Sequence, residues 1–84
     1  MKPPDKAQLA CDHAISVRVF SEHKKDSYYW VANWMYLGTD NDFDRFQNRD
    51  DEQSISVHQG DKRQIKFVKD WIHNHYNNIK KRRQ

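Results

Sequence analysis

The sequence predicts a small α+β protein, in which a three-stranded antiparallel sheet is packed by a long C-terminal helix and preceded by a short helix (αβββα order). Short segments of alternating apolar and polar residues indicate the strands. Apolar residues at every third or fourth position fill the last third of the chain and indicate the long helix. A length of 84 residues allows a single domain, 1–84.

The N-terminal part is expected to contain the short helix and the first strand. The helix spans 6–13, because Asp5 follows two prolines and is a favourable N-cap residue. Residues 15–19 alternate between β-branched apolar and polar side chains, which is typical of a strand with one face toward the core. The polar segment 22–27 then connects this strand to the next.

The central part is expected to contain the other two strands. Residues 28–37 are apolar on both faces, a pattern typical of a central strand, and Gly38 ends the segment. Ser54–His58 alternates again and is the third strand. Between them, 39–53 is expected to be a mobile acidic loop, because its few apolar groups do not offset the entropy of ordering.

The last helix is expected to begin after Gly60, where Asp61 and Gln64 have the spacing of a capping box. It extends to about residue 81 within a basic segment, 61–83. At 100° per residue its apolar positions fall within roughly 80° of one another. This core face consists of Ile65, Val68, Ile72, Tyr76 and Ile79, with His75 inside it and Trp71 at its edge.

Charge is unevenly distributed along the chain, whose formal net charge is +3. Residues 38–60 carry 2 basic and 6 acidic groups, whereas residues 61–84 carry 8 basic and 2 acidic groups. Beside the core face of the last helix, a basic row falls within about 60°. It consists of Lys62, Lys66, Lys69, His73 and Lys80, and is extended by Lys81, Arg82 and Arg83; Arg63 is a further candidate contact at the start of the helix. Such a row matches the needs of a phosphate backbone; it is also typical of a solvated helix face, or of a docking strip for an acidic protein.

The beginning of this helix resembles the corresponding part of double-stranded RNA-binding domains. In Gly60-Asp61-Lys62-Arg63-Gln64-Ile65-Lys66, a glycine, a capping residue, two adjacent basic residues and a further lysine have the spacing typical of that family. The resemblance implies phosphate contacts across the groove of A-form RNA. The chain departs from the family in its short polar first helix, its aromatic second strand and its long acidic insertion.

Four aromatic residues of the second expected strand are candidate contacts: Tyr29, Trp30, Trp34 and Tyr36. Exposed aromatic side chains on a sheet stack unpaired bases or anchor a protein interface. In a chain with so few leucines they could instead fill the core. One helix covers only one face of a sheet, so the uncovered face is also a candidate homodimer contact.

Six acidic residues of the expected loop form a second candidate surface, which could imitate phosphates toward a basic partner: Asp40, Asp42, Asp44, Asp50, Asp51 and Glu52. Asp40 and Asp51 also have the spacing of the ends of an EF-hand calcium loop. Arg45 occupies the position of the turn glycine, however, so no metal site is expected.

These patterns predict a non-catalytic binding module rather than an enzyme, with no cofactor and no membrane contact. The expected partner is nucleic acid or a nucleoprotein complex. The first alternative is a small inhibitor or adaptor, of the kind that phages and other mobile elements use against defence complexes, which blocks a partner protein surface. The second is a small ribonuclease-like toxin that uses His58 or His73. A single cysteine, Cys11, excludes an internal disulfide and favours a reduced, cytoplasmic location.

Overall fold

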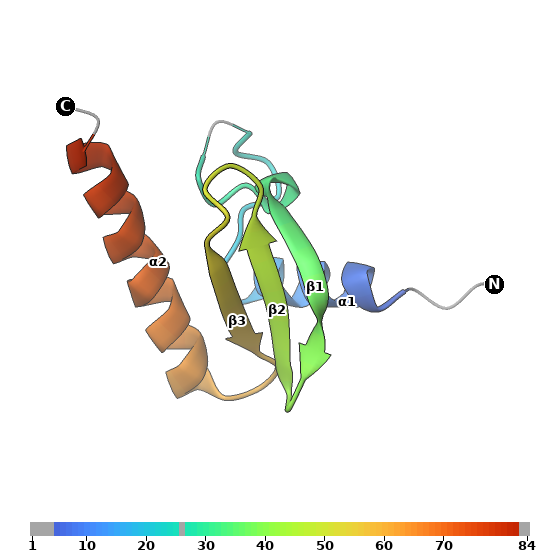
Figure 1. The fold of residues 1–84 in the computed structure, drawn as a ribbon. Coiled ribbons are helices and arrows are strands. Elements are labelled where there is room, and N and C mark those ends of the chain that lie inside the picture. The colour runs from blue at the N-terminus through green and yellow to red at the C-terminus, as the bar shows by residue number, and fades with distance from the viewer. Residues whose placement is uncertain (1–4, 26, 83–84) are drawn as a thin grey trace.

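The computed structural model describes residues 5–25 and 27–82 and has an α+β fold (Figure 1). Its elements are α1 (Lys6–Ser16), a 3-10 turn (Val31–Asn33), β1 (Trp34–Asp40), β2 (Phe43–Asn48), β3 (Ser54–His58) and α2 (Lys62–Arg82). The αβββα order and the antiparallel three-stranded sheet predicted from the sequence are therefore confirmed.

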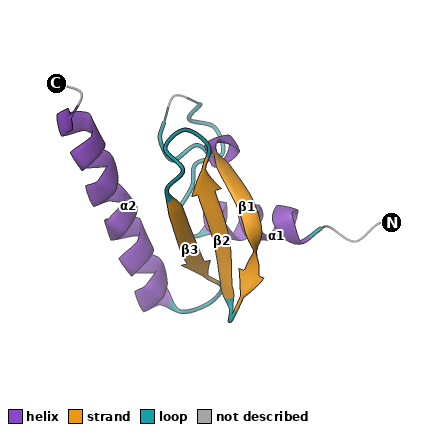
Figure 2. Cartoon of the chain, in the orientation of Figure 1, coloured by secondary structure: helices purple, strands orange, loops and turns teal. Residues whose placement is uncertain are grey.

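The three strands lie in the order β1-β2-β3, so β2 is the central strand (Figure 2). A two-residue turn at Asn41 and Asp42 joins β1 to β2. These residues have φ angles of 50° and 66°, as a type I′ hairpin turn requires, and both residue types tolerate this conformation. A bulge between Tyr36 and Gly38 shifts the register of β1, and Gly38 adopts a φ of 125° there.

The strand expected at 15–19 is wrong, because α1 continues through Ser16. The N-cap is as predicted: the Asp5 carboxylate accepts a hydrogen bond of 2.7 Å from the backbone N–H of Gln8. After the helix, Arg18 adopts a left-handed φ of 64° and the chain turns away. Ile15 therefore packs against the core from α1, and Val19 is buried from the irregular turn that follows, rather than from a strand.

The boundaries expected for the second strand and the acidic loop are also wrong. Only the end of 28–37 belongs to β1, and the expected loop 39–53 contains the whole of β2. The reason is that β2 buries polar side chains together with an apolar one. Asp44 is 3% exposed and accepts hydrogen bonds from the Thr39 hydroxyl (2.7 Å) and the Gln59 amide (3.0 Å), while Phe46 is fully buried.

One face of the sheet is covered and the other is open. In Figure 1, α1 crosses behind the sheet and α2 runs alongside β3. The buried side chains of the covered face are Trp34, Asp44, Phe46, Asn48, Ile55 and Val57, and they meet Ala10 and Ala14 of α1 and Ile65, Val68 and Ile72 of α2. Phe20 stacks on Trp34 with ring centroids 5.1 Å apart. The open face carries Met35, Arg45, Ser54 and Ser56.

We expect the backbone amides of β2 to be among the best protected in native-state hydrogen exchange, because a central strand pairs on both sides. Their exchange should be at least about 100-fold slower than that of the following loop, 49–53. Amide exchange followed by NMR measures this directly. Fast exchange throughout Phe43–Asn48 would contradict a stable central strand and would support the mobile acidic loop expected from the sequence.

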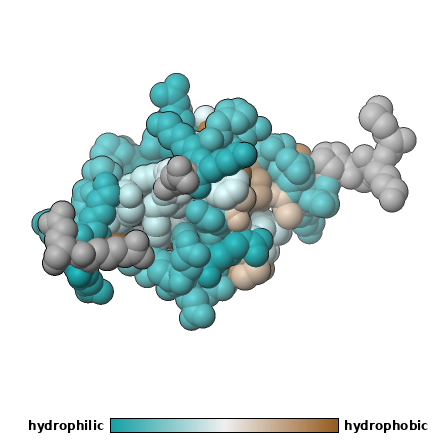
Figure 3. Space-filling view, turned by 90° about the horizontal axis from the view of Figure 1, so that it is seen from above, coloured by the Kyte–Doolittle hydropathy of each residue, from teal (hydrophilic) through white to brown (hydrophobic). Residues whose placement is uncertain are grey.

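The surface of the molecule is mostly polar and charged, as expected for a small domain with a small core. Seen from the end at which α2 finishes, it is predominantly hydrophilic, with apolar surface confined to small patches (Figure 3). Within the described ranges, neither helix combines the length and apolar character that crossing a bilayer requires.

Candidate nucleic-acid interface

The amphipathic character of α2 separates its core face from an exposed cationic flank. Ile65, Val68 and Ile72 are buried, as the periodicity predicts, and Tyr76 and Ile79 are half-buried. The residues of the basic row, Lys62, Lys66, Lys69, His73 and Lys80, are all exposed. Lys62 and Lys80 lie eighteen positions apart, so the row extends for about 27 Å along a rigid helix.

A cation that the sequence did not predict joins this flank. Arg18 lines a shallow hollow together with Tyr29, Lys69, Asp70 and His73, so the turn after α1 meets the middle of the basic row. The left-handed backbone at Arg18 places it there. Since this contact depends on how α1 ends and packs, no local sequence pattern indicates it.

Two aromatic side chains order the basic row. The Tyr29 hydroxyl lies 3.4 Å from Nδ1 of His73. Burial, and then the neighbouring Tyr76, raise the pKa of Tyr29, so this hydroxyl stays protonated. The ammonium of Lys80 lies 4.4 Å from the centre of the Tyr76 ring, a cation–π contact that restrains the long side chain.

The predicted cations differ in their surroundings, both within the row and outside it. Lys66 forms an ion pair of 2.8 Å with Asp70, one turn later on the same helix. Arg82 lies on the opposite flank of α2, in a hollow that it shares with His75 and Ile79. Arg63 and Lys81 project from the outer side of the helix between the two flanks. Arg83 lies outside the described residues.

The expected platform of exposed aromatic residues is not formed. Trp34 is 3% exposed and is a core residue, whose indole N–H donates to the backbone carbonyl of Tyr28. Tyr29, Trp30 and Tyr36 are half-buried. The reason is that the α1–β1 connection carries its own aromatic residues onto the covered face, where they pack with Trp34 and with Tyr76 of α2.

The six acidic residues do not form one surface either. Asp40 and Asp42 belong to the β1–β2 hairpin end, while Asp50, Asp51 and Glu52 belong to the β2–β3 loop. Successive connections of an antiparallel sheet lie at opposite ends of the shared strand, so the two groups are separated by the length of β2. The sixth residue, Asp44, is buried between them.

Asp51 instead attaches the β2–β3 loop to α2. Its carboxylate accepts a hydrogen bond of 2.7 Å from the Tyr28 hydroxyl, and Nε2 of His75 lies 3.1 Å from the same oxygen. Trp71 stacks on His75 with ring centroids 5.0 Å apart. Burial raises the pKa of Asp51, but the hydrogen bonds from Tyr28, the Gln53 backbone N–H and His75 outweigh it, so the pKa lies below its ordinary value.

A lowered pKa in the folded state makes Asp51 a source of stability that acid removes. The contribution is fully present above the ordinary carboxyl pKa of 3.8 and is lost as the pH falls through the lower folded value. We therefore expect Asp51→Asn to flatten the fall in unfolding free energy between about pH 5 and pH 2, measured by urea denaturation. Asp50→Asn removes the same charge from the same loop and is the control. Equal effects of the two substitutions would contradict the role of the Asp51 contacts.

His58 holds a turn. Its Nδ1 accepts hydrogen bonds from the backbone N–H groups of Gly60 (2.9 Å) and Asp61 (2.8 Å), and its ring packs against Phe43. These bonds position the start of α2, where the Asp61 carboxylate caps the helix by accepting from the Arg63 N–H at 2.8 Å. In the part of the chain that the structure describes, no group of three His, Cys, Asp or Glu side chains could hold a metal ion.

The fold and this flank define a small α+β protein with a cationic helix surface. Comparison with protein-family models, curated proteins and solved structures found no match, so the resemblance to double-stranded RNA-binding domains has no support from a family model.

Proposed function

We propose that this protein is a non-catalytic module that binds double-stranded nucleic acid, or a nucleoprotein complex containing it, through phosphate contacts of the basic row and Arg18. The observation that favours this function is the position of Arg18, which lines the same hollow as Lys69 and His73 at the middle of an exposed cationic flank. Cations fixed on rigid elements neutralise phosphates and release counterions, which favours binding. The proposal includes a cytoplasmic location.

The geometry favours a duplex over a single strand. The row extends about 27 Å, roughly three quarters of a duplex turn of about 34 Å, so its cations can follow the phosphates along one groove. Single-strand binders place exposed aromatic rings, on which bases stack, beside their cations. The aromatic residues near this flank are instead half-buried and packed against one another. Binding through phosphates alone is insensitive to base sequence.

Titration of the protein with duplexes of random sequence at increasing salt tests the proposal. A protein with four phosphate contacts should lose roughly 100-fold in affinity between about 50 and 200 mM salt, and an unpaired strand should bind more weakly than a duplex. The absence of salt-sensitive binding to RNA and DNA duplexes near 50 mM salt would show that the basic row does not bind phosphates.

A further inference from the structure

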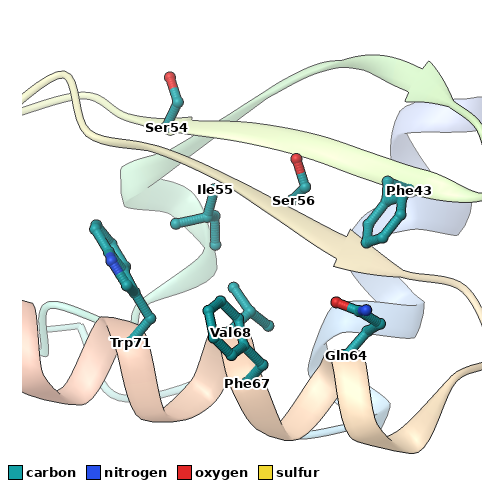
Figure 4. A pocket seen from close by; sticks show the side chains of 8 residues that line it. All are labelled: Phe43, Ser54, Ile55, Ser56, Gln64, Phe67, Val68 and Trp71. Atoms are coloured by element: carbon teal, nitrogen blue, oxygen red, sulfur yellow. The ribbon is translucent and has the colours of Figure 1, made fainter.

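The opposite flank of α2 borders an apolar groove that the nucleic-acid proposal does not use. The groove lies between α2 and β3, and Figure 4 shows Phe67, Val68 and Trp71 of α2 directed toward Ile55 of β3. The exposed fractions of Phe67 and Trp71 are 69% and 37%. These two side chains stand one helical turn apart and form an exposed aromatic wall, whereas Val68 and Ile55 form the buried floor.

The other wall is the free edge of the sheet. Among the strands of the described ranges, β3 pairs with β2 alone, because the strand order is β1-β2-β3. The backbone N–H of Gln59 donates to the Asp42 carbonyl, and that of Asn48 donates to the Gln53 carbonyl. Hydrogen-bonded pairs alternate along an antiparallel ladder, so Ile55 and Val57 bond to β2, and the backbone groups of Ser54, Ser56 and His58 point to the free edge.

The spacing of residues along the two walls of the groove suits an extended peptide. Phe67 and Trp71 are separated by about 6 Å along the helix axis, and alternate residues of a β-strand are separated by about 6.7 Å. Helix α2 lies beside β3 at an angle, and the two ribbons diverge from the Gln64 end toward the Trp71 end (Figure 4). A fourth strand paired with Ser54 and Ser56 would therefore direct two side chains, two residues apart, onto the two aromatic rings.

The charge around the groove favours an acidic peptide over a second copy of this chain as the ligand. Helix α2 carries seven lysines and arginines and one acidic residue, Asp70, which already pairs with Lys66. Arg45 opposes Ser56 in the β2–β3 ladder, and Arg63 lies one helical turn before Phe67, so both border the groove. Neither arginine forms an ion pair within the described residues. A second copy seated here would oppose two cationic helices, whereas an acidic peptide is attracted. Nucleic acid lacks the backbone N–H and C=O groups that a strand edge pairs with.

We propose that the groove between β3 and α2 binds an extended acidic segment of a partner protein, which adds to β3 as a fourth strand and places two apolar side chains on Phe67 and Trp71. This surface is independent of the basic row, because the two lie on opposite flanks of α2. The protein can therefore contact a polypeptide and a nucleic-acid backbone at the same time.

The proposal is tested by selecting a random 12-residue peptide library on the intact protein and measuring the selected peptides by fluorescence anisotropy. We expect apolar residues two positions apart, flanked by Asp or Glu. Trp71→Ser and Phe67→Ser should each weaken binding by at least about tenfold, because both substitutions remove exposed anchors and leave the core intact. Leu37→Ser removes an exposed apolar side chain away from the groove and should have no effect.

A backbone variant tests strand addition itself. Ser56→Pro removes an N–H that points to the free edge and spares the ladder with β2, so the protein should stay folded and lose peptide binding. Ser56→Ala should bind like the wild type. The proposal would be overturned if the selected peptides lacked apolar residues two positions apart flanked by Asp or Glu. It would also be overturned if Ser56→Pro bound these peptides as tightly as the wild type. A homodimer that Trp71→Ser dissociates, or oligonucleotide binding that the same substitution abolishes, would overturn it as well.

Discussion

Replacing Phe46 with alanine is expected to destabilise the protein by about 3–5 kcal/mol, the usual cost of removing a buried aromatic ring. Phe46 is fully buried in the middle of β2. Its ring contacts Phe20 edge-to-face at 4.9 Å and Tyr36 at 5.8 Å, so the cavity would open between the sheet and the α1–β1 connection. Since small domains are stable by only about 5–15 kcal/mol, the substitution should lower the urea midpoint severely.

Phe43 is the matched control for Phe46. It lies in the same strand but its side chain is half-buried and contacts the ring of His58. Phe43→Ala should therefore cost less than half as much free energy. Phe46→Leu keeps most of the volume and should fall between the two alanine variants, which keeps the comparison measurable if Phe46→Ala does not fold. Equal effects at positions 43 and 46 would contradict the burial of β2.

The long helix could be predicted because its signals are local. The capping residue Asp61 and the apolar period of Ile65, Val68 and Ile72 depend on residues a few positions apart, and the structure reproduces both. The same applies to the Asp5 cap of α1 and to the alternation of Ile55 and Val57 in β3. The starts of both helices and the strand β3 were therefore predicted correctly without any knowledge of tertiary contacts, although α1 extends three residues beyond its expected end.

The central strand could not be predicted from its polarity. Its inward positions are Asp44, Phe46 and Asn48. The Asp44 carboxylate accepts from Thr39 and from Gln59, which lies fifteen residues further on. The Asn48 side-chain oxygen accepts from the backbone N–H groups of Asp50 and Asp51 in the following loop. Because the sequence pattern expected of a strand has apolar residues at its inward positions, a segment with polar residues there is predicted to be exposed. The one local signal was the pair Asn41-Asp42, because both residues accept the positive φ of a tight hairpin turn.

The opposite error occurred at 15–19, where alternating β-branched residues predicted a strand. The capped helix continues over Ile15 and Ser16, and Val19 is buried from a turn. Alternation over five residues is too short to exclude a helix end followed by a buried turn. The number of strands was therefore right although two of the three were placed in the wrong segments.

The candidate site was predicted only where it follows helical periodicity. The basic row lies on one flank of α2, as the helical period of 100° per residue predicts, whereas the contribution of Arg18 depends on tertiary packing. Phe67 lies about 140° from the centre of the core face, a position at which a large apolar side chain has no role in the helix's own packing. Its misfit with the periodicity was the available signal for the groove beside β3.

The quadruple substitution of Lys62, Lys66, Lys69 and Lys80 by glutamine is expected to remove nucleic-acid binding while leaving the fold intact. Each phosphate contact contributes about 0.9 to the slope of log affinity against log salt on a duplex, so the slope should fall by about 3.6. At about 50 mM salt this corresponds to a loss of up to about 10⁴-fold in affinity. The four lysines are exposed, and exchange for glutamine in a helix costs little stability.

The control for this variant must change the net charge equally and leave the cationic flank untouched. Glutamine at Lys6, Lys24, Lys25 and Arg45, which are exposed and lie outside α2, meets this condition. Because the counterion term depends on cations held close to phosphates, this second variant should keep most of the slope and affinity. Thermal or urea denaturation of both variants separates loss of binding from loss of fold. Equal losses of affinity in the two variants would mean that diffuse positive charge, and not the row on α2, attracts the nucleic acid, since only contacts fixed on the helix predict the difference.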